Sequence, residues 1–224
     1  ALAKLALRQL APQMDIYAFC SQIGTIYANN PADIKVARAI SDSNAVRCPD
    51  SEAANKMESL IKEVHKEQDS IGGVVSCIIE NCPVGLGEPL FDKLHARLGY
   101  TMLNINAAKG FEYGDGFDSA TQRGSYHNDS FATDEKGNIA TTSNHSGGIQ
   151  GGISNGQTIS FRVAFKPTPT IGIAQQTVDK NLNAVTLEAK GRHDPCVVPR
   201  AVPVVENCAA FVILDSLLMN KIWQ

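Results

Sequence analysis

The sequence has no large net charge, no long apolar run and no opening signal segment. Its 224 residues carry a net charge of −3, and 19% of them are charged. This balance gives no global attraction to nucleic acid or to an anionic membrane, so neither partner is expected. The longest apolar stretch, 209–219, is interrupted by Asp215 and Ser216 and is too short to span a bilayer. No charged segment followed by an apolar one begins the chain, so no secretion signal is predicted.

The cysteines and histidines lack the spacings of a disulfide framework or a zinc site. No CxxC motif and no paired histidines occur, so no metal is expected. The favoured interpretation is free thiols in a reducing cytoplasm. The six cysteines are Cys20, Cys48, Cys77, Cys82, Cys196 and Cys208.

Helix and strand patterns are mixed without a regular β-α-β rhythm, which predicts an α+β fold in a single domain, 1–224. The predicted strands are 16–28, 74–80 and 159–165, with a hairpin over 172–189 that turns at 179–183. The predicted helices are one ending at Pro12, one starting at Asn30-Pro31 and running through Ile40, one capped by Asp50, one opened by Pro89, and one beginning near Pro203 and buried on most sides.

Both ends of the sequence are interpreted as cut. The first residues are already in helical register without a capping side chain, and the last eight stop inside an apolar helix pattern. We therefore expect a piece of a larger protein.

The stretch 108–156 is rich in Gly, Ser, Asn, Asp and Thr, and 118–146 is predicted to be an excursion with a hairpin turning at 134–137. Loops of this length are usually functional or mobile. Five glycines follow within 147–156. They would allow the backbone to approach a flat or anionic ligand closely, with a flexible loop as the alternative.

Residues 152–156, GISNG, match the G-x-S-x-G pattern of hydrolase nucleophiles. That motif requires a strand before the serine and a helix after it. Here a polar loop precedes Ser154 and a strand follows it, which argues against a hydrolase. A hydrolase would require Ser154 to react with an acyl or phosphonyl probe.

Two further polar segments follow predicted strands. Residues 166–170, KPTPT, form a stiff element with one ammonium and two hydroxyls, suited to holding a phosphate or a cofactor edge, or simply ending a strand. In 192–195, RHDP, alternation places Arg192 and Asp194 on one side and His193 on the other. Such a pair indicates an anion or acid–base site, and a structural salt bridge is an equal alternative.

Taken in order, these segments resemble chorismate synthase, and the similarity covers essentially the whole chain. The stretches that carry it are INAAKGFEYGDGF (105–117), SNHSGGIQGGISNG (143–156), RVAFKPTPTI (162–171) and GRHDPCVVPRAVPVVE (191–206), with RCPD, DSIGGVV and GLGEPLFDKL upstream. The resemblance implies a helix-containing β sandwich, a cytoplasmic homotetramer and a flavoprotein that uses reduced FMN.

The activity implied is that of a phosphate lyase of the shikimate pathway for aromatic amino-acid biosynthesis. It would form chorismate by 1,4-anti elimination of phosphate from 5-enolpyruvylshikimate-3-phosphate. Asp194 would lie near flavin N5 as the proton acceptor or relay, and Lys166 would favour the anionic reduced flavin. The residues implied to contact FMN are Asn106, Ala107, Gly151, Lys166, Pro167, Thr168, Pro169, Thr170 and Arg192.

The sequence also departs from the family pattern. It contains no G-E-S-H-G motif and no R-x-x-x-R-x-S/A-x-R-E-T run. We therefore expect a fragment that lacks about the N-terminal third and the extreme C-terminus, with the acid for the leaving phosphate and most of the substrate clamp. His145 is interpreted as a structural residue or a loop contact rather than a replacement for the missing histidines, and the fragment is expected to be inactive alone. The alternative is a non-catalytic module that binds flavin or phosphate.

Overall fold

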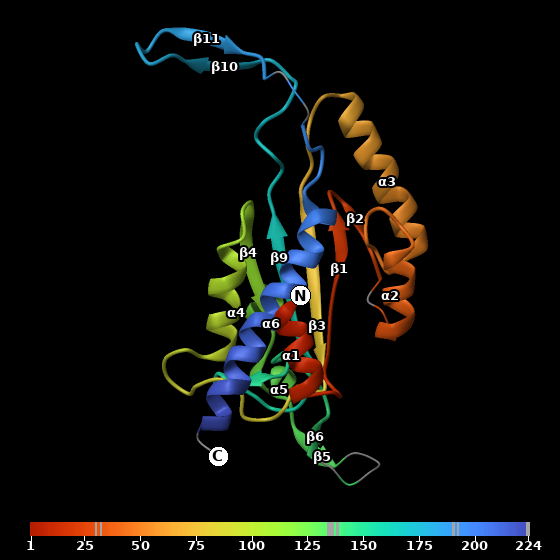
Figure 1. Cartoon of the computed structure of the whole chain (residues 1–224), viewed down its shortest axis with the longest axis vertical. Coiled ribbons are helices and arrows are strands. Elements are labelled where there is room, and N and C mark those ends of the chain that lie inside the picture. The colour runs from red at the N-terminus through yellow and green to blue at the C-terminus, as the bar shows by residue number, and fades with distance from the viewer. Residues whose placement is uncertain are drawn as a thin grey trace. The chain divides into compact units, whose positions relative to one another are not determined.

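The computed structural model describes residues 1–29, 31, 33–133, 137, 139–189, 191 and 193–222. Helices and strands are interspersed along the chain, which confirms the predicted α+β class (Figure 1). The helices are α1 (Leu2–Leu10), α2 (Ile34–Asp42), α3 (Ser51–Lys66), α4 (Leu94–Leu103), the 3-10 helix η1 (Gly116–Thr121), α5 (Gly124–His127) and α6 (Val198–Ile222).

Five strands form the main sheet, in the order β2-β1-β3-β9-β4. β1 and β2 form an antiparallel hairpin, so the predicted strand 16–28 is divided by a turn at Gly24. The strands of this sheet are β1 (Asp15–Ile23), β2 (Ile26–Tyr27), β3 (Gly73–Glu80), β4 (Ala108–Tyr113) and β9 (Ile159–Phe165).

Three two-stranded antiparallel sheets accompany the main one. The hairpin predicted over 172–189 is confirmed by the antiparallel pairing of β10 with β11. In its turn, the Asp179 carboxylate accepts hydrogen bonds from the N–H groups of Asn181 and Asn183. Residues 134–136 of the predicted turn lie outside the described part, and β5 and β6 on either side pair with each other. These strands are β5 (Phe131–Thr133), β6 (Ile139–Thr141), β7 (Ile149–Gln150), β8 (Ile153–Ser154), β10 (Gln175–Val178) and β11 (Ala184–Leu187).

The chain divides into two compact units. Unit 1 comprises Ala1–Ala18, Val75–Val163 and Val202–Gln224, and unit 2 comprises Phe19–Val74 and Ala164–Ala201. The single domain predicted for 1–224 stays a prediction.

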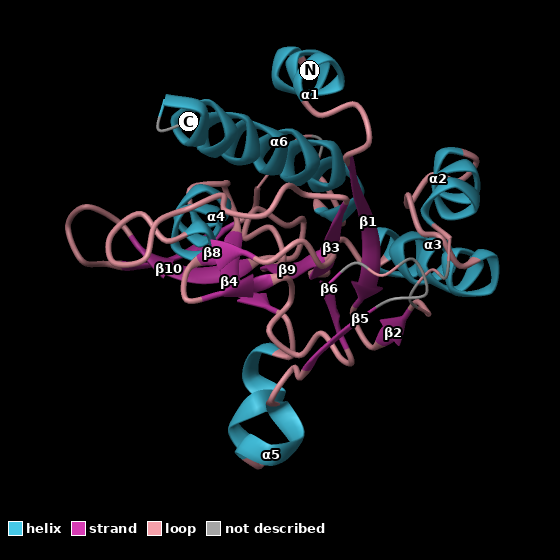
Figure 2. Cartoon of the chain, turned by 90° about the horizontal axis from the view of Figure 1, so that it is seen from below, coloured by secondary structure: helices cyan, strands magenta, loops and turns pink. Residues whose placement is uncertain are grey.

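In unit 1, charged contacts join the helices that cover one side of its strands, whereas α5 lies on the opposite side (Figure 2). Glu206 of α6 forms an ion pair with Lys4 of α1, and its other carboxylate oxygen accepts a hydrogen bond from the Ala18 N–H at 2.9 Å. Arg97 of α4 pairs with Asp215 of α6. These contacts fix α1 and α4 against α6.

Helix α6 differs from its prediction. It begins at Val198, five residues before Pro203. Pro199 lies in the first turn, where its missing N–H group is tolerated, whereas Pro203 lies inside the helix. The prediction that it is buried on most sides is wrong, since Phe211 is 63% exposed and Leu218 46%. With 25 residues and a mean hydropathy of 1.7, α6 is long and apolar enough to cross a membrane, a property that core helices of soluble proteins share.

Two other helix starts are corrected. α2 is capped by Asp33, whose carboxylate accepts the N–H groups of Lys35 and Val36, and not at Asn30, which lies outside the described residues. α4 begins at Leu94 and not at Pro89, and Leu90 is 72% exposed. In both cases the proline lies in the segment before the helix, where its fixed φ and its missing N–H group are tolerated.

The cysteine prediction is confirmed, since all six are free and five are buried. Burial raises the pKa of the Cys82 thiol to about 12, and of the Cys48 and Cys196 thiols to about 11. These three side chains therefore act as small apolar groups at neutral pH.

Replacing Asp50 by Ala should lower the free energy of unfolding by about 1 kcal/mol, because its carboxylate caps α3 through the N–H groups of Glu52 and Ala53. Hydrogen bonding, from Ala53 first, lowers the pKa of Asp50, so the loss should be full above the unfolded pKa of about 3.9 and disappear as the pH falls through the folded value. Urea unfolding at pH 7 and in acid measures this. Glu63→Ala, in the exposed face of the same helix, is the control, and an equal loss in acid would contradict the assignment.

Candidate functional site

In unit 2, the KPTPT segment lies beside Asp194. The Thr168 hydroxyl donates to the Asp194 carbonyl at 2.7 Å, and the Ser70 hydroxyl donates to the Thr168 carbonyl at 2.6 Å. The Ile71 N–H donates to the Pro195 carbonyl at 2.8 Å. Segments distant in sequence are therefore held together here, and we call residues 166–170 with Ser70 and Asp194 the KPTPT cluster.

The charged groups of the KPTPT cluster differ in how they are engaged. Within the described residues, the Lys166 ammonium donates only to the neighbouring Pro167 carbonyl, at 3.2 Å. The Asp194 carboxylate lies 3.3 Å from the guanidinium of Arg200 in α6. Arg192, predicted to share a site with Asp194, lies outside the described residues. The cluster thus offers one cation without a carboxylate partner and one paired acid.

His193 makes a contact of its own, apart from that of Asp194. Its Nε2 lies 3.1 Å from the Ala189 carbonyl. It also lines a cavity of about 610 Å³ with Gly191, His65 and Lys66.

In unit 1, Asn106 and Ala107 form the turn between α4 and β4. Ala107 has φ +70°, a left-handed conformation that is uncommon for a residue with a side chain and is often found at functional sites. Asn106 is exposed. The structure therefore places an unusual backbone conformation at a predicted FMN contact.

The glycines of 147–156 serve mainly to pack the protein on itself. A Cβ on Gly147 would lie 2.4 Å from the Gly114 nitrogen, and one on Gly152 would lie 2.6 Å from the Glu88 carbonyl oxygen. Gly151 differs, because a Cβ there would meet no described atom within 4 Å. Of these glycines, Gly151 is thus the one that leaves space for a ligand.

Ser154, the serine of the G-x-S-x-G match, is 1% exposed in β8. Its hydroxyl donates to the Pro83 carbonyl at 2.6 Å and accepts from the Leu86 N–H at 2.9 Å. These contacts make the hydroxyl a structural group, in agreement with the prediction against a hydrolase.

Gly151 opens onto a cavity of about 740 Å³ in unit 1, which we call the histidine cavity. Its wall combines aromatic rings with three imidazoles and one carboxylate, and it holds no lysine or arginine from the described residues. The lining includes His95, Tyr100, Phe111, Glu112, Tyr113, Phe117, His127, His145, Ser146 and Gly151.

His95 stacks on Tyr113, with ring centroids 4.7 Å apart and planes 11° from parallel. Burial, and then the nearby Lys93 cation, lowers the pKa of His95, so its ring is neutral at pH 7. Its Nδ1 is buried and has no hydrogen-bond partner among the described residues. Glu112, on the same strand as Tyr113, pairs with Arg162 at 2.5 Å.

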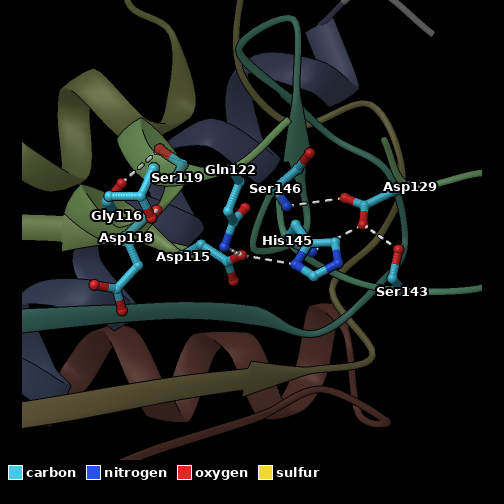
Figure 3. A network of polar contacts seen from close by, with 10 residues as sticks. Asp115, Gly116, Asp118, Ser119, Gln122, Asp129, Ser143, His145 and Ser146 are labelled. Carbon is cyan, nitrogen blue, oxygen red and sulfur yellow. Dashed lines mark hydrogen bonds and ion pairs between the residues drawn. The ribbon is translucent and has the colours of Figure 1, made fainter. Parts of the chain in front are cut away.

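Asp129 holds the segment that carries His145 (Figure 3). Its carboxylate is buried and accepts hydrogen bonds from the Ser143 hydroxyl at 2.7 Å and from the N–H groups of His145 and Ser146, each at 2.8 Å. Burial alone would raise the pKa of Asp129, but these bonds outweigh it and lower the pKa to about 2. The carboxylate is therefore ionised across the physiological range.

A second acid, Asp115, contacts the His145 ring itself. Its Oδ2 lies 2.7 Å from Nδ1 of His145 and accepts the Gln122 amide at 2.8 Å (Figure 3). Burial raises the pKa of Asp115, but the bonds from Gln122 and His145 outweigh it, so the pKa lies below its usual value. The ring also packs against Tyr126 and His127, at centroid distances of 4.8 and 5.6 Å.

Comparison with known proteins gives the family. The family model described as chorismate synthase matches residues 1–218. The chain belongs to the chorismate synthase family. It is 55% identical over 222 residues to the chorismate synthase of Cytophaga hutchinsonii and 54% identical over 225 residues to that of Bacteroides fragilis. A solved structure entitled "Crystal Structure of Chorismate Synthase" has a TM-score of 0.78 at 29% identity and covers 98% of this chain, which supports the predicted fold.

The chain spans 61% and 62% of the length of these two chorismate synthases, and 60% of the solved chain. Within this part, the structure assembles Lys166–Thr170 with Asp194 in unit 2. It places Asn106, Ala107 and Gly151 in unit 1. Their contacts with FMN stay predictions.

The histidine cavity was not predicted. Sequence reasoning treated His145 as a structural residue or a loop contact and passed over Asp115, Asp129 and His95, because these four residues are separated by 14 to 50 positions and share no local spacing. The one available signal was the run of Asp and His within an excursion of unusual length.

Replacing Asp129 by Asn should lower the free energy of unfolding at pH 7 by about 2 kcal/mol, because one amide NH₂ would replace an acceptor. The folded pKa lies below the unfolded one, so the difference from the wild type should be full above about pH 4 and be lost as the pH falls through about 2. Denaturant unfolding across this range tests the expectation. Asp118→Asn, an exposed acid of η1, is the control, and a difference that keeps its full size at pH 2 would contradict it.

Proposed function

We propose that this chain carries the FMN-binding part of a chorismate synthase. The proposed reaction is the 1,4-anti elimination of phosphate from 5-enolpyruvylshikimate-3-phosphate with reduced FMN, as part of the shikimate pathway. The observation that supports it most is the KPTPT cluster, in which segments from two motifs of the family are hydrogen-bonded to each other. We further propose a cytoplasmic homotetramer for the complete assembly.

The residues present fit a flavin phosphate or an anionic ring edge. Lys166 has no carboxylate partner among the described residues, so its charge is available to an anion. Pro167 and Pro169 fix the backbone on either side of Thr168, which limits the entropy lost on binding. Gly151 leaves open space where a side chain would otherwise stand.

Each residue then has a defined part. Lys166, Arg192 and the KPTPT backbone would hold and orient the cofactor, and Asn106, Ala107 and Gly151 are the further residues that the family resemblance implies as FMN contacts. When bound, reduced FMN would supply electron density to the allylic phosphate ester. The Asp194 carboxylate would accept or relay the C6 proton, and Arg200 holds its side chain in place at 3.3 Å.

The chain should bind reduced FMN, and Lys166→Ala and Arg192→Ala should each weaken binding by about tenfold or more. A charge-assisted hydrogen bond contributes about 1.5–3 kcal/mol, and 1.4 kcal/mol corresponds to a factor of ten. Anaerobic titration followed by flavin absorbance and fluorescence measures the affinity. Lys180→Ala, at the exposed β10–β11 turn, should bind like the wild type. Equal affinity of all three variants would refute a flavin site on these segments.

Turnover separates the lyase from a non-catalytic flavin- or phosphate-binding module. Because the chain spans about three fifths of its relatives, we expect it to form chorismate at less than about 1% of the rate of the Cytophaga hutchinsonii enzyme, a loss typical of removing an acid–base group. Chorismate release under anaerobic conditions with reduced FMN is the assay. Supplying the remaining part of a relative in trans should restore turnover if the chain is the lyase, and a failure to restore it despite flavin binding would favour the module.

A further inference from the structure

We propose that Ser70 is a positioning residue of the KPTPT cluster, and that it acts through Thr168 to set the place of Asp194. The parts that Thr168 and Asp194 would play toward flavin rest on the proposed function, whereas the positioning follows from hydrogen bonds within unit 2. Ser70 itself is not among the residues that the family resemblance implies as FMN contacts.

Ser70 is half-buried and lies in a segment, 68–72, that runs beside the KPTPT residues. Its hydroxyl donates to the Thr168 carbonyl at 2.6 Å. Two residues further on, a Cβ at Gly72 would lie 2.4 Å from the Phe165 carbonyl oxygen. This close approach leaves no room for a side chain between the two segments, so their separation is fixed next to Ser70.

Backbone hydrogen bonds hold the same segment on both sides of Ser70. The Gly172 N–H donates to the Gln68 carbonyl at 2.8 Å, and the Ile71 N–H donates to the Pro195 carbonyl at 2.8 Å. Gln68 has φ +61°, a left-handed conformation that persists where surrounding contacts hold it. Ser70 is therefore a fixed point between the residues that follow KPTPT and Pro195.

The hydroxyl of Thr168 makes the second link. It donates to the Asp194 carbonyl at 2.7 Å, while the Thr168 carbonyl receives the Ser70 hydroxyl. A hydroxyl carries one proton, so this one cannot also donate to a flavin phosphate or ring. Thr168, which the resemblance implies as an FMN contact, therefore gives its side-chain donor to the protein. In the same segment the Lys166 ammonium, which among the described residues donates only to the Pro167 carbonyl, is left as the donor for an anion.

Asp194 is consequently held at two points. Thr168 holds its backbone carbonyl, and the guanidinium of Arg200 lies 3.3 Å from its carboxylate. A proton acceptor must lie within hydrogen-bond reach of the atom that it serves, and a displacement of about 1 Å caused by a distant change can lower a rate by about 10²-fold. Loss of the Ser70 hydroxyl would release the Thr168 carbonyl and, with it, one of the two points that hold Asp194.

The test follows Asp194 directly in the whole chain, labelled with ¹³C and ¹⁵N and kept free of flavin. Thr168→Val preserves the shape of the side chain without its donor and should shift the resonance of the Asp194 carbonyl carbon. Ser70→Ala should shift the same resonance, although the hydroxyl that it removes is bonded to Thr168 and not to Asp194. A folded Ser70→Ala protein whose Asp194 resonances match those of the wild type would overturn the proposal.

Two matched variants separate positioning from a general loss of stability. Thr168→Ser keeps the hydroxyl and should retain the wild-type Asp194 resonance. Ser59→Ala, in α3 of the same unit, removes a hydroxyl that donates to the Asn55 carbonyl at 2.9 Å, and it should leave that resonance unchanged. A shift in Ser59→Ala as large as that in Ser70→Ala would mean that any lost serine hydrogen bond in unit 2 disturbs Asp194, against the proposal.

Anaerobic titration with reduced FMN then relates the positioning to the flavin site. Ser70→Ala and Thr168→Val should each weaken binding about twofold to tenfold, the range for one hydrogen bond between uncharged groups. The double variant should bind about as weakly as the weaker single variant, because both changes interrupt one chain of bonds. Losses that multiply would contradict this chain. If the wild type does not bind FMN, the proposed function fails, whereas the Asp194 resonances still decide the positioning.

Discussion

A carboxylate that is taken out of water must receive hydrogen bonds, and Asp129 receives them from residues 143–146. These hydrogen bonds join the two ends of the segment 130–142, since Asp129 precedes it and residues 143–146 follow it. The hairpin of β5 and β6 lies within this closed segment. The wall of the histidine cavity, which includes His145, Ser146 and Gly151, follows directly after the closing bonds.

The glycines that follow residues 143–146 are also held in place, by close contacts with other parts of the backbone. Gly147 approaches the backbone of Gly114, and Gly148 approaches the carbonyl of Thr158, so the glycine-rich segment is packed against β4 and the start of β9. Two positive-φ residues, Gly151 and Gly152, then form the tight turn between β7 and β8. A segment whose composition is typical of a flexible loop is therefore a packed element with one open position at Gly151.

The sequence predicted those features that depend on local patterns. The alternation of Ile159 to Phe165, the Asp50 cap and the hairpin around Asp179 each have a signal within a few residues, and each is present. Starts near prolines were misplaced by three to five residues at α2, α4 and α6, because proline is compatible with both the first turn and the loop before it. The contacts of Asp115 with His145 join positions 30 apart, and no local rule identifies such a pair.

The contacts of Asp194 with Arg200 and of Asp115 with His145 differ in the chemistry that they allow. Arg200 presents only hydrogen-bond donors, so its contact with Asp194 can hold the carboxylate in place. In the Asp115–His145 pair the carboxylate faces a ring nitrogen that, unlike a guanidinium, can be either a donor or an acceptor.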